Sequence, residues 1–177
     1  MFIAGVTADP TAQEIYVVDN DIGDRMMVFP YDADGNVKPK RVLSVPHQAW
    51  GVSINHGRDE VAITVEAPRE IVIYKRTATG SDAPLRIIRG PSTGLGDPHG
   101  IFFDGTNNEL IVANHGNNGG REPAPSQSVD EDETDTIVGG RFDPPSITVY
   151  PGLPRCSCTK PASTILDCIF NSDSTPG

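Results

Sequence analysis

The stretch GVTADPTAQEIYVV, residues 5–18, occurs in three similar versions along this chain. It returns as GVSINHGRDEVAIT at residues 51–64 and as GIFFDGTNNELIVA at residues 100–113, and the three versions align without gaps. Each starts with Gly and then Val or Ile, and each carries a glutamate nine residues after the Gly. Apolar residues follow the glutamate at alternate positions, which is the period of a β-strand, and a short polar segment separates the two apolar runs. Each version therefore predicts a β-hairpin.

The sequence after each hairpin predicts two more strands. The third strand is predicted at MMVF (26–29), IVIY (71–74) and ITVY (147–150), and the fourth at PKRVL (39–43), PLRII (84–88) and, less regularly, PASTI from Pro161. The repeats start 46 and 49 residues apart, at Gly5, Gly51 and Gly100, which suits four short antiparallel strands per unit. This is the unit of a β-propeller blade. The predicted fold is all-β, one domain of three four-stranded antiparallel blades at residues 1–49, 50–98 and 99–177, forming a partial or half propeller.

The same residues resemble a known family. The pattern Pro-x-Gly-Ile followed by NELIVAN at residues 98–114, ITVY at 147–150 and APLRIIRGPSTGL at 83–95 looks like bacterial NHL-repeat-type β-propellers. The resemblance covers nearly the whole chain but is poor from Gly152 onward. It implies that the first strand of each blade lines a central channel. It also implies a family whose members mostly bind partners, with a minority that are lyases or lactone hydrolases.

Composition agrees with this fold class and excludes some functions. The chain of 177 residues has 18 Gly and 16 Pro, which favour chain reversals over helices. Its net charge is −10 and it has no basic cluster, so nucleic acid is not an expected partner. We expect neither a signal peptide nor a membrane span in this sequence, and the cellular location stays undetermined. The three cysteines, Cys156, Cys158 and Cys168, are odd in number and lack the pattern of a structural zinc site, which leaves their pairing open.

Three blades are too few to close a propeller, which usually has about four to eight. The chain is therefore expected either to be a piece of a longer protein or to complete a ring with a second copy of itself. Of these two alternatives the sequence favours the fragment, because open blade faces would expose large apolar patches. Self-association or contact with the remaining blades is expected in either case.

The candidate site lies where the turns after the second and fourth strands meet at the channel mouth. Alignment of the repeats puts His99 at the position of Ala4 and Trp50, and His115 at the position of Asn20 and Glu66. Polar and aromatic groups from neighbouring blades should thus converge on one rim, where a ligand or a metal ion such as zinc can be held. The candidate ligand-binding residues are Trp50, Glu66, His99, Asn114 and His115, and His99 and His115 are the candidate metal ligands.

Other local patterns are interpreted as structural. Gly90 to Gly94 matches G-x-S-x-G, but no helix can follow Ser92 as a nucleophile elbow requires. Asp32 and Asp34 lie in a turn whose glycine comes too early for a calcium loop. His47 and His56 are expected to be ordinary loop histidines. The insertion at 116–145, with DEDETD at 130–135, is expected to be a solvated acidic loop, with a lid, a calcium loop or a subunit contact as alternatives.

These observations lead to one preferred function and two alternatives. The preferred hypothesis is a non-catalytic binding or assembly module that recognises a protein or small-molecule ligand at the channel mouth and requires no cofactor. The first alternative is a metal-assisted lyase or lactone hydrolase in which His99 and His115 hold a divalent ion and Glu66 acts as base or ligand. The second is a structural protein that assembles through its open blade faces.

Overall fold

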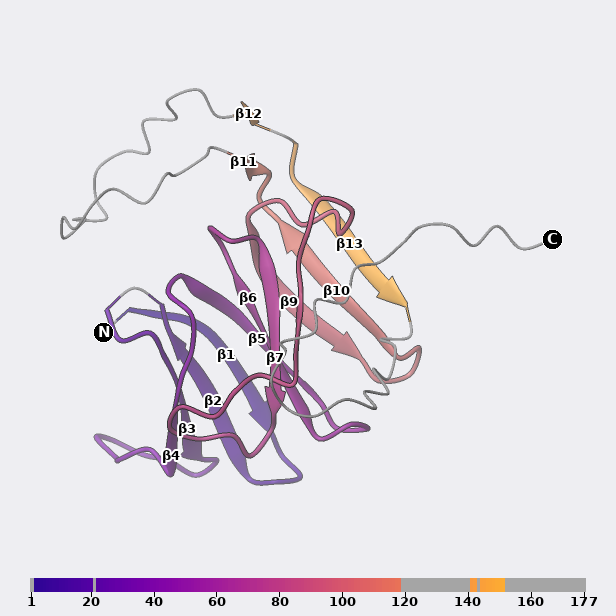
Figure 1. Ribbon diagram of the computed structural model, residues 1–177. Helices are drawn as coiled ribbons and strands as arrows, with labels where there is room; N and C mark the ends of the chain where they lie inside the picture. Colours follow the sequence, from indigo (N-terminus) through magenta and orange to yellow (C-terminus); the bar gives the residue numbers. More distant parts are fainter. Residues whose placement is uncertain (1, 21, 119–140, 143, 152–177) are drawn as a thin grey trace.

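The computed structural model describes residues 2–20, 22–118, 141–142 and 144–151 (Figure 1). Strands and turns make up this part of the chain, and none of its segments forms a helix that could cross a membrane. The first sheet contains β1 (Ile3–Asp9), β2 (Glu14–Asp19), β3 (Arg25–Pro30) and β4 (Arg41–Ser44). The second contains β5 (Ala49–Asn55), β6 (Glu60–Val65), β7 (Glu70–Lys75) and β8 (Arg86–Ile88). The third contains β9 (Pro98–Asp104), β10 (Glu109–Asn114) and β13 (Ser146–Pro151).

Each sheet is an antiparallel meander, with strands paired in the order in which they follow along the chain. The predicted hairpins and third strands are all present. The two fourth strands begin at Arg41 and Arg86, two residues after the prolines that were expected to open them, because proline has no N–H to donate to the ladder. The strand expected at Pro161 lies outside the described residues, as do the three cysteines, so the third sheet is described by three strands.

The ends of the long insertion pair with each other. β11 (Asn117–Asn118) and β12 (Arg141–Phe142) form a short antiparallel ladder directly after β10 and before β13. The insertion thus leaves and rejoins the third sheet at one place, beyond the end of β10 (Figure 1). The acidic run at 130–135 lies outside the described residues.

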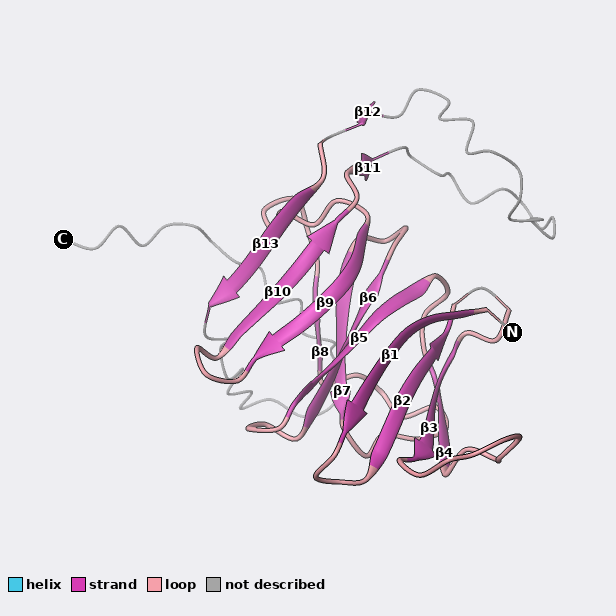
Figure 2. Ribbon diagram, turned by 180° about the vertical axis from the view of Figure 1, so that it is seen from behind, coloured by secondary structure: helices cyan, strands magenta, loops and turns pink. Residues whose placement is uncertain are grey.

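The three sheets stand side by side with their first strands adjacent (Figure 2). β5 packs against both β1 and β9, so the first strands form one continuous row. The approach is close: a Cβ at Gly5 would overlap the carbonyl oxygen of Trp50, and one at Gly51 would overlap that of His99. Glycine at the first position of the first two repeats is therefore required by the contact between neighbouring blades.

Two apolar clusters hold the sheets together. One fills the space between the first and second sheets and includes Tyr16, Leu43 and Ile63. The other lies between the second and third sheets and includes Ile71, Leu110 and Tyr150. Side chains of the middle sheet contribute to both clusters, because alternate residues of β6 and β7 point to opposite faces. Each sheet alone has two apolar faces, so packing of neighbours is what buries them.

The glutamates of the first two repeats have a structural role that the sequence alone did not indicate. Glu60, on β6, accepts two hydrogen bonds from the Arg86 guanidinium on β8, at 2.7 and 2.6 Å, and both residues are buried. Glu14 pairs with Arg41 in the first sheet in the same way, at 2.7 Å for both contacts. The hydrogen bonds from Arg41 hold the pKa of Glu14 far below its ordinary value of 4.5, although burial opposes this shift. These pairs tie the second strand of a blade to its fourth.

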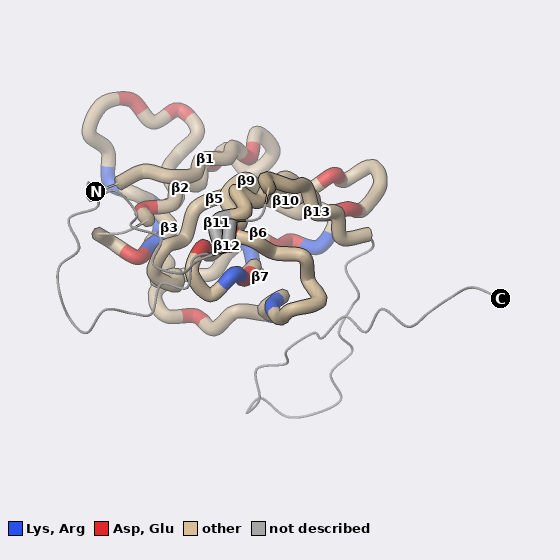
Figure 3. Tube along the Cα trace, turned by 90° about the horizontal axis from the view of Figure 1, so that it is seen from above, with Lys and Arg blue, Asp and Glu red and all other residues tan. Residues whose placement is uncertain are grey.

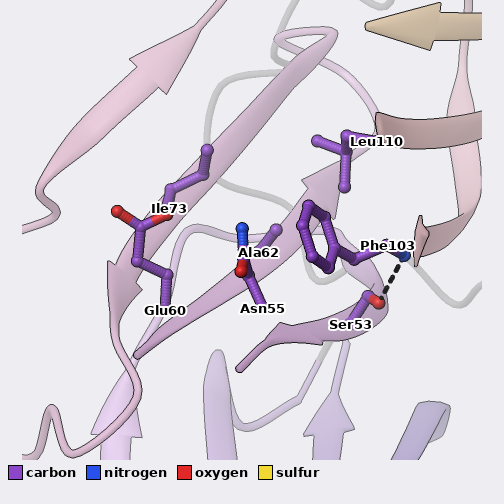
Figure 4. A pocket seen from close by; sticks show the side chains of 7 residues that line it. All are labelled: Ser53, Asn55, Glu60, Ala62, Ile73, Phe103 and Leu110. Carbon is purple, nitrogen blue, oxygen red and sulfur yellow. Dashed lines mark hydrogen bonds between the residues drawn. The ribbon is translucent and has the colours of Figure 1, made fainter. Parts of the chain in front are cut away.

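A small pocket lies in the interface between the second and third sheets (Figure 4). Ser53 and Phe103 meet there, with the Phe103 N–H donating to the Ser53 hydroxyl at 2.9 Å. The buried Asn55 side-chain nitrogen has no hydrogen-bond partner among the described residues. The space is suited to a bound water rather than to a larger ligand. Its lining residues are Ser53, Asn55, Glu60, Ala62, Ile73, Phe103 and Leu110.

Charged residues are distributed along the described trace without a basic patch on one element (Figure 3).

Candidate functional site

The repeated backbone hydrogen bonds at one end of the sheets define the frame of the candidate site. In each blade the residue directly after the second strand donates its N–H to a backbone carbonyl. The acceptor is the residue three positions before the first glycine of the repeat. The three bonds are Asn20 to Phe2 at 2.9 Å, Glu66 to Gln48 at 3.0 Å, and His115 to Asp97 at 3.0 Å. The turns Gly96 to His99 and Asn114 to Gly116 are therefore neighbours, as expected from the arrangement of strands in a propeller blade.

Aromatic rings from two blades form a continuous stack on this frame. The Trp50 indole, at the start of β5, lies 4.2 Å from the His99 imidazole at the start of β9, with the ring planes 11° apart. The His115 ring lies 3.7 Å from that of His99, tilted by 38°. Phe2 meets the other side of Trp50 edge-on, at 6.0 Å. The rings are thus layered, and His115, whose side chain is 61% exposed, is the layer that faces solvent.

Glu66 is held at the side of this stack. Its carboxylate accepts a hydrogen bond from the Trp50 indole N–H at 2.7 Å. This bond fixes both the orientation of the indole and the position of the carboxylate at the rim. Trp50 and Glu66 are both partly buried, so each keeps some surface toward solvent.

Asp97 joins the site although the sequence analysis did not select it. Its carboxylate is buried, and its Oδ1 lies 2.9 Å from His99 Nε2 while its Oδ2 lies 4.0 Å from His115 Nδ1. The 2.9 Å approach lacks the alignment of a hydrogen bond, and both atoms are without a hydrogen-bond partner among the described residues. Residue spacing gave no signal for Asp97, because its backbone is left-handed, with a φ of 54°, and the period of an extended strand does not apply to it.

Asn114 has a supporting position rather than an open one. Its side chain is buried, and its oxygen accepts a hydrogen bond from the Gly96 N–H at 3.1 Å. Its nitrogen donates to the hydroxyls of Ser146 at 3.3 Å and Thr148 at 2.9 Å. The amide thus ties the turn before His99 to β13 and orients the segment that carries Asp97.

Thr64 connects the site to the middle of the second sheet. Its buried hydroxyl accepts from the Gly51 N–H at 2.8 Å and donates to the His99 carbonyl at 2.6 Å. One side chain thereby links β5, β6 and β9 directly beneath the Trp50 and His99 rings. No motif in the sequence singled out this threonine.

Of the two other histidines, His56 lies away from this frame, whereas His47 directly precedes Gln48, a residue of the frame. His56 is in the β5–β6 turn at the opposite end of the sheet, where its Nδ1 lies 3.8 Å from Asp9 Oδ2. His47 Nδ1 lies 2.9 Å from Asp24 Oδ1 on an exposed loop. Ser92 is exposed in a turn in which the Thr93 N–H donates to the Gly90 carbonyl, and β9 follows this segment.

Comparison with known proteins supports the fold and goes no further. No family model matches the sequence, and no curated protein matches it. Among solved structures, hydrazine synthase from Kuenenia stuttgartiensis aligns with a TM-score of 0.50 and 12% identity, over 63% of this chain and 30% of that one. The WD40 β-propeller domain of Doa1 aligns with a TM-score of 0.49 and 13% identity, over 64% and 35%. A chain of the nidogen–laminin complex aligns with a TM-score of 0.45 and 18% identity, over 64% and 40%.

The chain therefore spans about 30 to 40% of the length of these structures. With its repeated antiparallel sheets and adjacent first strands, it is an all-β chain with the fold of part of a β-propeller.

Proposed function

We propose that this chain is a non-catalytic binding module that recognises a protein partner or a small ligand at the rim formed by Trp50, Glu66, His99 and His115, with Asn114 in support. The observation that carries the proposal is the stack of three rings contributed by two blades, which ends in the exposed His115. The ring edges, the Glu66 carboxylate and the His115 nitrogens offer apolar and polar contacts within one small area. Such a combination is typical of ligand sites on rigid scaffolds.

The rigidity of the rim supports binding. The backbone bonds from Glu66 and His115 and the hydroxyl of Thr64 fix both turns to the sheets. Because the rings are already stacked, a ligand would meet them with little ordering of side chains, which reduces the entropic cost of binding.

Trp50 provides the test, because it is the only tryptophan of the chain. Peptides selected from a displayed random library and a fragment collection would be titrated while the Trp50 fluorescence is recorded. We expect His115→Ala and Glu66→Ala to weaken the binding of the selected probes by about tenfold or more in Kd, which corresponds to about 1.4 kcal/mol. His56→Ala, in a turn at the opposite end of its sheet, is the matched control and should have no effect. Probes that bind equally well to His115→Ala and Glu66→Ala would refute the proposal.

A second role, self-association or contact with further blades, is supported by the outward faces of the first and third sheets. Val6 on β1 and Val42 on β4 are exposed in the first sheet, and Phe102, Ile147 and Val149 are exposed on the third. Val6, Val17, Met27 and Val42 lie in one cross-strand row of the first sheet, and Phe102, Ile111 and Val149 in one row of the third. Rows like these are buried where the described sheets meet.

Light scattering after gel filtration tests this second role. We expect the natural chain to form a two-copy species. Val149→Lys should convert this species to a monomer, and the loop variant Val37→Lys should not. A chain that stays monomeric at all concentrations would exclude self-association and leave contact with other blades as the way to cover these faces.

A further inference from the structure

We propose that Asp97, His99 and His115 bind one divalent transition-metal ion, with Zn²⁺ as the preferred ion. Each side chain offers one ligand atom, and these atoms all lie within 4.8 Å of one another. Two imidazole nitrogens with one carboxylate oxygen form a donor set that zinc and related ions favour. This inference rests on the proposed rim, since His99 and His115 belong to it, and it names the chemistry by which that rim would take a ligand.

The strongest evidence is an unsatisfied pair of buried atoms. Asp97 is only 5% exposed, yet its Oδ1 has no hydrogen-bond partner among the described residues. The same holds for His99 Nε2, 2.9 Å away. Buried polar atoms are normally hydrogen-bonded, and the 2.9 Å contact between these two atoms lacks the alignment of a hydrogen bond, which is costly at a buried carboxylate. An ion held by both atoms would remove this cost.

The distances suit an ion after small side-chain movements. Ligand atoms around a tetrahedral zinc ion, each at ~2.0–2.2 Å from the metal, lie roughly 3.3–3.5 Å from each other. The distance from Asp97 Oδ1 to His99 Nε2, 2.9 Å, is shorter than this, and the distance from the other carboxylate oxygen, Oδ2, to His115 Nδ1, 4.0 Å, is longer. Binding would draw the exposed His115 ring toward Asp97 and loosen its stack on His99.

The backbone keeps the three residues together in the absence of an ion. Asp97 has a positive φ of 54°, which is uncommon outside glycine, and its carbonyl accepts the His115 N–H at 3.0 Å. Gly116 N–H and Gly96 carbonyl form a second bond of 3.0 Å beside it. The left-handed residue is thus fixed on both sides, so little backbone ordering remains for the ion to bring about.

Three protein ligands leave one coordination position open. Sites of this kind keep a water molecule or one donor atom of a bound molecule in the fourth position. Because His115 is the exposed member of the group, the open position is expected on the solvent side of the rim, beside Trp50 and Glu66. A peptide or small molecule with a carboxylate or imidazole donor would then be held by the ion and the rim together.

The test is a titration of the full chain, freed of metal by a chelator, with zinc chloride in a calorimeter. It is carried out on the Cys156→Ser, Cys158→Ser, Cys168→Ser variant as well as on the natural chain, since thiolates also bind zinc. We expect one ion per chain in both. His115→Ala and Asp97→Asn should weaken binding by at least about tenfold. His56→Ala should leave it unchanged, and circular dichroism would show whether each variant is folded.

Fluorescence gives an independent measurement of position. Ni²⁺ bound to His99 should quench Trp50 strongly, because the two rings are 4.2 Å apart, and His115→Ala should abolish the quenching. No zinc bound in stoichiometric amount, or binding that is the same in folded His115→Ala, would overturn the metal site.

The results separate this inference from the proposed function. If probes bind in the presence of a chelator, and this binding is lost in His115→Ala, the binding module is supported and the metal ion is not required. If zinc binds but no probe loses affinity in the rim variants His115→Ala and Glu66→Ala, the metal site is supported and the binding module is rejected.

Discussion

The indole of Trp50 and the imidazole of His99 stack at 4.2 Å with planes 11° from parallel, although each is the second residue of a strand in a different sheet. They occupy the same position of two successive repeats. Their contact therefore depends on how closely the first strands approach, and Gly51, which follows Trp50, permits that approach. The site forms because the repeat places different side chains at equivalent positions of neighbouring blades.

The first prediction concerns the link beneath this stack. Thr64→Val keeps the shape of the side chain but leaves the Gly51 N–H and the His99 carbonyl without the Thr64 hydroxyl. We expect a loss of about 1–3 kcal/mol in the free energy of unfolding, measured in urea, because buried polar groups lose their partner. The Trp50 emission should shift as well, since the position of His99 changes.

Thr64→Ser is the control for this variant, because it keeps the hydroxyl. If Thr64→Val and Thr64→Ser have the same stability and the same emission as the natural chain, the hydroxyl does not link the blades.

The second prediction uses the glycines of the repeat as a matched pair. Gly51→Ala would place a methyl group against the His99 carbonyl and should destabilise the chain by roughly 1–3 kcal/mol, the usual range for overpacking. Gly100→Ala should be tolerated, since its Cβ would come no nearer than 3.4 Å to Ala113. Thermal unfolding of both variants measures the difference. Equal melting temperatures would contradict the close approach of β5 and β9.

The third prediction concerns the buried pair of Glu60 and Arg86. Arg86→Met leaves the carboxylate buried without its partner and should cost about 3–5 kcal/mol in the free energy of unfolding. The double variant Glu60→Leu, Arg86→Met removes both charges and should recover much of this loss. Urea unfolding of the single and double variants is the measurement. A single variant as stable as the natural chain would show that the pair does not hold β6 to β8.

The fourth prediction concerns how the stability of the folded chain depends on pH. The pKa of Glu14 is held far below 4.5 in the folded chain, mainly by hydrogen bonds from Arg41. The unfolded chain binds a proton at an ordinary glutamate pKa, so the contribution of Glu14 is present above pH 4.5 and is lost as the pH falls toward the folded pKa. Urea midpoints recorded between pH 6 and about pH 2 should therefore decrease.

Glu14→Gln is the comparison for that series. It should be less stable than the natural chain at pH 6, and the difference should narrow as the pH falls. A constant difference between the two chains across the series would contradict the lowered pKa.

The sequence by itself determined the repeat, the strands and the neighbouring turns at the rim. Alternation of apolar residues is a local property of an extended chain, and three gap-free copies gave the same pattern at residues 5–18, 51–64 and 100–113. The equivalence of Glu66 and His115 followed from that alignment, and the backbone bonds of the two residues agree with it.

Only the tertiary structure decided which side chains meet. Asp97 approaches His99 and His115 because its backbone is left-handed and because β10 returns the chain to the same edge. Glu60 and Arg86 are 26 residues apart and meet across the intervening strand β7. Contacts of this kind depend on strand register and on the packing of one sheet against the next, which residue spacing along the chain does not encode. The sequence therefore specifies where the rim lies, and the packing of the blades specifies its chemistry.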